Sequence, residues 1–149
     1  MQIAKAMGAE VTGVCSGRNA EMVRSLGADR VIDYTKEDFA RDTARYDVLL
    51  DNVGNRTLSD CRRVLNPDGR YVLIAGGGPE DHKWVGPLGR IAHAVLLSKF
   101  GSQEMGIFIS DMKKEDLAAL ADLMASGKVT PVIDRTYPLG EVAEAVRYV

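Results

Sequence analysis

The sequence reads AMGAEV at residues 6–11 and SLGADRV at residues 25–31, two similar passages about twenty residues apart. Each places a glycine after a helical stretch, where a left-handed residue closes a helix without a steric penalty, and then begins a run that favours strand. Such alternation is typical of parallel βαβ units. The elements predicted here are a helix over 2–7, a strand over 10–15, a helix over 19–26 and a strand over 29–33.

The alternation continues toward the C-terminus. Thr35 and Asp38 have the spacing of a capping box, which predicts a short helix over 35–44. Leu117, Leu120 and Met124 recur at helical spacing within 113–126 and form one apolar face. Further strands are predicted over 46–51, 70–75 and 105–109, helices over 55–65, 85–98 and 139–149, a turn over 66–69 and an extended segment over 129–138. The predicted fold is therefore α/β, with a Rossmann-like, doubly wound parallel sheet.

Composition excludes several classes of protein. The 149 residues include 19 Lys and Arg against 21 Asp and Glu, and 46% are hydrophobic. This balance excludes intrinsic disorder and collagen-like structure, and the lack of a basic stripe argues against nucleic acid as a partner. No apolar run reaches the roughly 18–20 residues of a membrane span, and the first residues lack the build of a signal peptide. We expect a soluble, cytoplasmic protein with no membrane partner.

The cysteines and histidines do not have the spacing of a metal site. Cys15 and Cys61 are far apart and outside any C-x-x-C motif, and neither His82 nor His93 has a second histidine at ligand spacing. We expect two free thiols in or near the core and no metal site built from this chain.

Both ends of the chain look cut. The chain opens inside a helix, its final helix has no stop signal, and no G-x-G-x-x-G motif precedes the first helix. The strands of a parallel sheet are buried on both faces. We therefore expect the alternation of strands and helices to begin with a strand before residue 2. We expect residues 1–149 to be one Rossmann-like domain truncated at both ends, without its first strand and glycine-rich turn.

The most informative loop follows the strand at 10–15. Folds that prefer NAD place Asp or Glu at this point to bind the ribose 2′-hydroxyl, whereas here Cys15 and Ser16 stand there, with Arg18 close behind. A hydroxyl and a guanidinium would accept a 2′-phosphate, so NADPH is favoured over NADH. The alternative is that Ser16 caps the following helix and Arg18 is an ordinary solvated charge.

Residues after the other strands are weaker candidates. Tyr34 could stack on or hydrogen-bond the adenosine end, or only cover the strand edge. Glycines at 54 and 76 would permit close approach of the backbone to a ribose or nicotinamide, or only form turns. Composition alone makes Phe108 a core residue. There is no P-loop, and no G-x-S-x-G motif points to a hydrolase.

Residues 2–14, 23–34 and 46–54 resemble the nucleotide domain of the medium-chain dehydrogenase/reductase superfamily. Residues 127–139 are similar to its quinone oxidoreductase-like, zinc-independent branch in particular. The resemblance covers nearly the whole chain. It implies an NADPH-dependent oxidoreductase that passes hydride to a quinone or an α,β-unsaturated carbonyl compound, with the chemistry supplied by the cofactor.

The resemblance also implies three groups of cofactor-binding residues. The adenosine 2′-phosphate would be held by Ser16, Arg18 and Tyr34, the ribose region by Asn52, Val53 and Gly54, and the nicotinamide end by Ala75, Gly76, Phe108 and Ile109. No catalytic residue is indicated, and the substrate is not specified.

Two other functions remain open from the sequence. A non-catalytic Rossmann-like domain could act in chain association, because apolar edges left by missing segments would favour a homodimer. A methyltransferase of similar sheet type is disfavoured, because it would carry an acidic residue where Ser16 stands.

Overall fold

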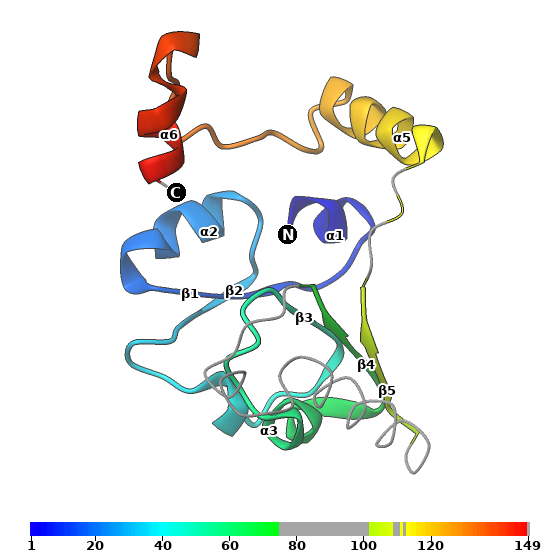
Figure 1. Cartoon of the computed structure of the whole chain (residues 1–149). Helices are drawn as coiled ribbons and strands as arrows, with labels where there is room; N and C mark the ends of the chain where they lie inside the picture. The colour runs from blue at the N-terminus through cyan, green and yellow to red at the C-terminus, as the bar shows by residue number, and fades with distance from the viewer. Residues whose placement is uncertain (75–101, 109–110, 112, 149) are drawn as a thin grey trace.

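The structure, a computed structural model, describes residues 1–74, 102–108, 111 and 113–148 (Figure 1). The N-terminal elements follow the predicted order. They are α1 (Gln2–Ala6), β1 (Thr12–Cys15), the 3-10 turn η1 (Gly17–Asn19), α2 (Ala20–Ser25) and β2 (Arg30–Asp33). Strands β1 and β2 pair in parallel, with Thr12 opposite Arg30 and Cys15 opposite Asp33.

The repeated passage closes both helices in the same way. Gly8 and Gly27 have φ of 85° and 95°, the left-handed conformation that glycine adopts without strain. The next amide reaches back to the helix in each case, from Ala9 N to Ala4 O at 3.0 Å and from Ala28 N to Val23 O at 3.3 Å. The repeat is therefore confirmed as one structural unit used twice.

A second parallel sheet follows, with the order β3-β4-β5. Its strands are β3 (Tyr46–Asp51), β4 (Leu65–Leu73) and β5 (Glu104–Ile107), with η2 (Phe39–Arg41) before β3 and α3 (Leu58–Arg63) between β3 and β4. The predicted turn over 66–69 lies inside β4, where the pairing with β3 shifts register. A Cβ on Gly69 would lie 3.0 Å from the carbonyl oxygens of Asn66 and Tyr46, so only glycine fits there without displacing backbone.

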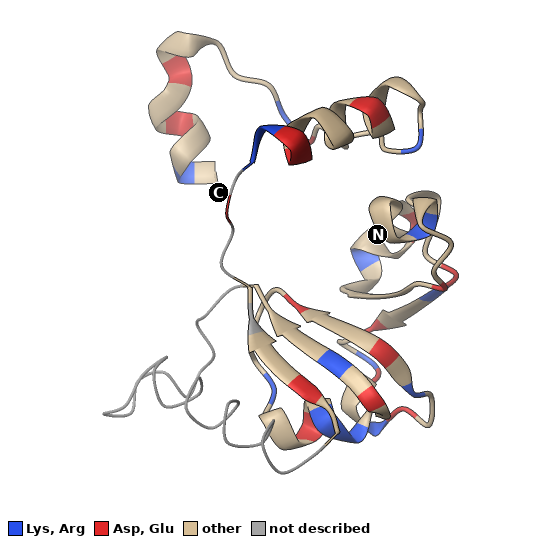
Figure 2. Cartoon of the chain, turned by 90° about the vertical axis from the view of Figure 1, so that its right-hand side faces the viewer, with Lys and Arg blue, Asp and Glu red and all other residues tan. Residues whose placement is uncertain are grey.

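The largest cluster of buried side chains belongs to this second sheet and α3. It comprises Leu58, Cys61, Leu65, Tyr71, Leu73 and Met105. Figures 1 and 2 show α1 and α2 on one side of the strands and α3 on the other, as in a doubly wound α/β protein. Cys61 is fully buried, Cys15 is half-buried, and neither forms a disulfide, which confirms the expectation of reduced thiols in or near the core.

The two sheets correspond to parts of one larger order. In the doubly wound order 3-2-1-4-5-6, the pair β2-β1 corresponds to positions 3-2 and the trio β3-β4-β5 to positions 4-5-6. No described residue forms a strand at position 1. The Rossmann-like fold predicted from the sequence is confirmed by these parallel sheets and by the solved structures compared below.

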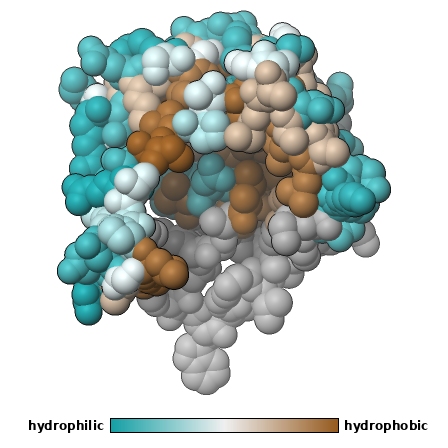
Figure 3. Space-filling model, turned by 90° about the horizontal axis from the view of Figure 1, so that it is seen from above, coloured by the Kyte–Doolittle hydropathy of each residue, from teal (hydrophilic) through white to brown (hydrophobic). Residues whose placement is uncertain are grey.

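The C-terminal part consists of α5 (Lys114–Ala125), η3 (Leu139–Glu141) and α6 (Val142–Tyr148), joined by an extended segment. None of residues 113–148 is buried. Seen from above, apolar side chains face a hollow in this side of the molecule (Figure 3). The segment is joined to α1 by Gln2, whose side-chain amide donates to Thr130 O at 2.8 Å and whose carbonyl oxygen accepts from Thr130 N at 2.5 Å.

The helix predicted over 35–44 is wrong. One 3-10 turn, η2, forms there, and its N-cap is Asp38. The expected cap, Thr35, instead donates its amide and its hydroxyl to Asp33, at 3.0 and 2.7 Å. Because Asp33 engages both groups, residues 33–37 form a side-chain-stabilised turn in place of the first turn of a helix.

The assignment of Phe108 to the core is also wrong. Its side chain is 56% exposed, one residue beyond the end of β5. The helix predicted over 85–98, together with His82 and His93, lies outside the described residues.

Candidate nucleotide-binding edge

The carboxyl ends of β1 and β2 lie side by side. Their parallel register pairs Cys15 with Asp33, and the amide of Tyr34 donates to Cys15 O at 3.1 Å. The first residues after the two strands, Ser16 and Tyr34, are therefore neighbours at one edge of the sheet. Tyr34 is 57% exposed, so its ring is available to a ligand at this edge.

The turn after β1 presents Arg18 to solvent. Ser16 is extended (φ −75°, ψ 152°), and its carbonyl accepts the amide of Asn19 at 2.9 Å, which forms η1. The Ser16 hydroxyl makes no capping hydrogen bond, so helix capping does not account for this side chain. Arg18 is exposed and has no carboxylate partner within the described part of the chain. The structure thus places Ser16 beside Tyr34, with Arg18 two residues further along the turn.

A carboxylate that sequence reasoning missed lies behind this turn. Asp33, the last residue of β2, accepts hydrogen bonds from the amide and the hydroxyl of Thr35, and Lys36 Nζ lies 3.6 Å from its Oδ2. These contacts, the Thr35 hydroxyl first, hold the pKa of the Asp33 carboxyl below its usual value. Asp33 is therefore ionised at neutral pH. The side chain is 13% exposed.

Asp33 also lies close to the backbone of Gly17. A Cβ added at Gly17 would lie 2.5 Å from Asp33 Oδ2, a distance that real Cβ atoms do not show. The carboxylate therefore lies directly against the turn.

The loop after β3 is fixed by a second carboxylate at a strand end. Asp51 Oδ1 accepts the amides of Val53 and Gly54, at 3.0 and 2.7 Å, while its Oδ2 accepts the Tyr71 hydroxyl at 2.9 Å. Gly54 is buried and has φ of 68°, a left-handed backbone conformation that favours glycine. Asn52 and Val53 are exposed, so the loop could offer side chains and backbone to a ligand.

The third predicted group is only partly described. Phe108 is exposed just beyond β5, and its amide donates to Leu73 O at 2.9 Å, which places it beside the end of β4. Ala75, Gly76 and Ile109 lie outside the described residues.

Asp33 and Asp51 share a signal that was present in the sequence. Each is the last residue of a strand and bonds an amide two residues later, the pattern of an Asx turn. An aspartate at the end of a predicted strand is therefore a candidate to fix the loop that follows it.

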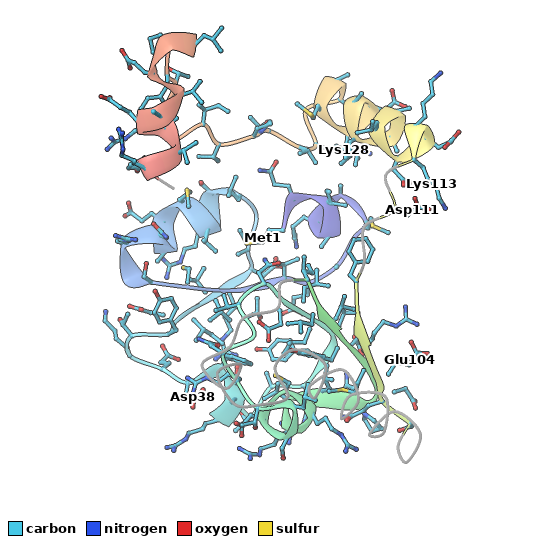
Figure 4. All side chains as sticks on the ribbon, in the orientation of Figure 1. Met1, Asp38, Glu104, Asp111, Lys113 and Lys128 are labelled. Atoms are coloured by element: carbon cyan, nitrogen blue, oxygen red, sulfur yellow. The ribbon has the colours of Figure 1, made fainter. Side chains whose placement is uncertain are left out.

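Two pockets lie at other ends of the strands. One of about 230 Å³ is lined by residues of β2 and of the segment between β2 and β3, among them Arg30, Asp38 and Asp42. Figure 4 labels Asp38 beside η2. Another of about 470 Å³ is lined by Arg62, Arg63 and Gln103, among others. Neither pocket is lined by a predicted cofactor residue. Lys, Arg, Asp and Glu are intermixed over the strands and helices (Figure 2).

The described residues also limit what else can be assigned. Among them, His, Cys, Asp and Glu nowhere gather in threes as metal ligands do. Their helices are all too short or too polar to cross a membrane.

Residues 26–149 match the family described as zinc-binding dehydrogenase. The chain belongs to this family. The match confirms the resemblance to the medium-chain dehydrogenase/reductase superfamily that residues 2–14, 23–34, 46–54 and 127–139 suggest. Because the described residues bring no three metal ligands together, we assign none of them to the zinc in the family's description.

Two relatives align with almost all of the chain. The mouse protein named NAD(P)H oxidoreductase RTN4IP1, mitochondrial, is 32% identical, and the alignment covers 97% of this chain and 40% of the mouse protein. The chloroplast envelope quinone oxidoreductase homolog of Arabidopsis thaliana is 30% identical, with 97% of this chain and 43% of that protein covered. The chain thus spans less than half the length of these relatives.

A solved structure supports the fold. The quinone oxidoreductase from Coxiella burnetii superposes on 99% of this chain and 43% of its own, with a TM-score of 0.78 and 24% identity. This similarity confirms the Rossmann-like arrangement of the strands and helices.

Proposed function

We propose that this chain is the NADPH-binding part of an oxidoreductase that transfers hydride to a quinone or an α,β-unsaturated carbonyl compound. The observation that carries the proposal is that Ser16 and Tyr34 are neighbours at one edge of the sheet, with Arg18 on the turn that follows Ser16, in a chain of the zinc-binding dehydrogenase family. The relatives named NAD(P)H oxidoreductase and quinone oxidoreductase support the same class of reaction.

The donor set fits a phosphorylated ribose. A guanidinium can bind phosphate oxygens through two parallel hydrogen bonds, and the Ser16 hydroxyl and Tyr34 phenol can each add one more. Bound NADPH would supply the hydride. The residues of this chain would bind and orient it, through the adenosine end at β1 and β2 and through the loop held by Asp51 at β3.

Ligand titration tests the proposal. NADPH should raise the melting temperature of the chain more than NADH does, and Arg18→Glu should abolish this preference, because a carboxylate repels the 2′-phosphate. Arg147→Glu, the same charge change on exposed α6, should leave it intact. A preference unchanged by Arg18→Glu would remove Arg18 from the site, and no stabilisation by either nucleotide would refute the proposal.

One observation favours the alternative, a non-catalytic domain that associates with another chain. Several apolar side chains of α5 and the segment after it are exposed, including Leu117 at 59%, Ile133 at 69% and Leu139 at 90%. Contiguous exposure of this kind often marks a protein interface. A stable homodimer in analytical ultracentrifugation together with no response to NADPH would favour this function. Stabilisation by S-adenosylmethionine would favour a methyltransferase.

A further inference from the structure

The charges around the turn after β1 do not all favour a phosphate. Arg18 is on the turn itself, and Lys36 lies near it through its contact with Asp33, at 3.6 Å. Asp33 contributes one negative charge between them. The three groups sum to a charge of about +1, whereas the two cations alone would sum to about +2.

The negative charge is close to the turn and poorly screened. The Asp33 carboxylate lies against the turn, because a Cβ built on Gly17 would be only 2.5 Å from Asp33 Oδ2. Ser16 and Arg18 flank Gly17 directly, so a phosphate bound by them would lie near this carboxylate. Lys36 offsets it only weakly, because its side chain is 77% exposed while that of Asp33 is 13% exposed.

We propose that Asp33 is a specificity-determining residue which weakens the preference of this edge for the 2′-phosphate, so that the site accepts NADH as well as NADPH. The inference rests on the proposed function, since it assumes that the adenosine end of a nicotinamide nucleotide binds at Ser16, Arg18 and Tyr34. Sequence reasoning looked for the discriminating anion at the end of β1. The structure places one at the end of β2, against the same turn.

A purely positional role for Asp33 would have a different consequence. If the carboxylate only held the turn in place, its loss would weaken binding of phosphorylated and unphosphorylated adenosine nucleotides alike. If its charge sets the preference, its loss would change the ratio of the two affinities. The ratio therefore separates the two roles.

The decisive variant is Asp33→Asn, which keeps the shape of the side chain and an acceptor oxygen for Thr35 while removing the charge. The probes are 2′,5′-ADP and 5′-AMP, which differ by the 2′-phosphate, together with NADPH and NADH. At low salt, the ratio of the affinity for 2′,5′-ADP to that for 5′-AMP should rise about three- to tenfold, as expected for one charge removed from beside a phosphate near a surface. Affinity for 5′-AMP should change by less than about twofold.

Asp29→Asn is the matched control. Asp29 immediately precedes β2 and also accepts a backbone amide, that of Val11 at 2.7 Å, while Lys5 contacts its carboxylate. It lies four residues from Asp33, about 13 Å along the strand, so its charge should be screened from the turn. The ratio should therefore not change.

Lys36→Gln is a second variant, and it does not threaten folding because the residue is exposed. Its loss of a positive charge should lower the ratio of the affinity for 2′,5′-ADP to that for 5′-AMP about threefold.

Each outcome has a definite meaning. A ratio that rises in Asp33→Asn but not in Asp29→Asn supports the inference. An unchanged ratio with binding intact, an equal loss of affinity for both probes, or an unchanged ratio in Lys36→Gln overturns it and leaves the proposed function standing. Failure of the unmodified chain to bind any of the four nucleotides overturns the proposed function, and the inference with it.

Discussion

Helices α3 and α5 differ in what holds them in place. The six residues of α3 begin at an N-cap, Thr57, whose hydroxyl accepts the amide of Asp60, and they bury Leu58 and Cys61. The twelve residues of α5 begin at Lys113 without a side-chain cap and bury nothing. The shorter helix belongs to the packed part of the molecule, residues 1–74 and 102–108. The longer one belongs to the C-terminal arm, residues 113–148, in which no residue is buried.

This difference separates two kinds of information in a sequence. Periodic leucines determine that residues 114–125 form a helix with one apolar face, yet Leu117 and Met124 remain 59% and 49% exposed. A short helix such as α3 gains its stability from the sheet that covers it, since isolated helices of this length are marginal in water. The local pattern of apolar residues specifies that a helix forms. Its apolar face is buried only where another part of the protein packs against it.

The largest effect is expected at the centre of the packed part. Tyr71 is 1% exposed and donates its hydroxyl to Asp51 at 2.9 Å. Tyr71→Ala should lower the free energy of unfolding by about 3–5 kcal/mol, because it opens a cavity between β4 and its neighbours. Tyr71→Phe should lower it by about 1–2 kcal/mol, because only the hydrogen bond is lost. Urea denaturation measures both, and equal values for the two variants would contradict this division.

A smaller loss is expected at the turn inside β4. Gly69→Ala would place a Cβ 3.0 Å from two backbone oxygens. We expect it to lower the free energy of unfolding by about 1–3 kcal/mol, as overpacking does. Gly106→Ala in β5 is the control, because nothing lies within 4 Å of its added Cβ. If the urea midpoints of the two variants fall equally, crowding at residue 69 is not the cause.

The packed part should also respond to acid through Asp29. The hydrogen bond from Lys5, followed by that from the Val11 amide, lowers the pKa of Asp29. The unfolded chain therefore binds this proton more readily than the folded chain, so the contribution of Asp29 to stability is present above the unfolded pKa and is lost as the pH falls through the folded value. Asp29→Asn should reduce stability at about pH 7 and converge with the unmodified chain below about pH 4. A constant difference between their denaturation curves across this range would contradict the assignment.

The smallest effect is expected on the arm. Leu120→Ala removes a side chain that is 39% exposed on α5, and the free energy of unfolding should change by no more than about 0.5 kcal/mol. Leu73→Ala, the same substitution at a residue that is 4% exposed in β4, should lower it by about 2–5 kcal/mol. A loss of that size for Leu120→Ala would mean that α5 is covered in solution, for instance by a second copy of the chain.

Most of the described fold could be predicted because its boundaries are set locally. Gly8, Gly27 and Gly127 all adopt positive φ at the helix ends where the sequence places them. The helix predicted over 35–44 failed because the capping-box spacing does not show which other group can bind the Thr35 hydroxyl. This hydroxyl donates to Asp33, two residues before it, and does not cap a helix. The exposure of Phe108 was missed because composition does not reveal which apolar side chains the fold leaves uncovered.

The sequence predicted which residues of the candidate site follow a strand, but not which side chains contact one another between paired strands. Ser16 and Tyr34 were chosen because each follows a strand, and the parallel register then makes them neighbours. Asp33 was read as the last residue of a strand, and its contact with Gly17 depends on how two strands pair. A side-chain contact between two paired strands cannot be predicted from the sequence of either strand alone.

The two hydrogen bonds between Gln2 and Thr130 join residues that are 128 positions apart. A contact between such distant residues closes a very long loop, so it should form late in refolding, after the local βαβ units are in place. The Thr130 amide would then exchange with deuterium at the rate at which the arm detaches. It would report on docking of the arm separately from global unfolding.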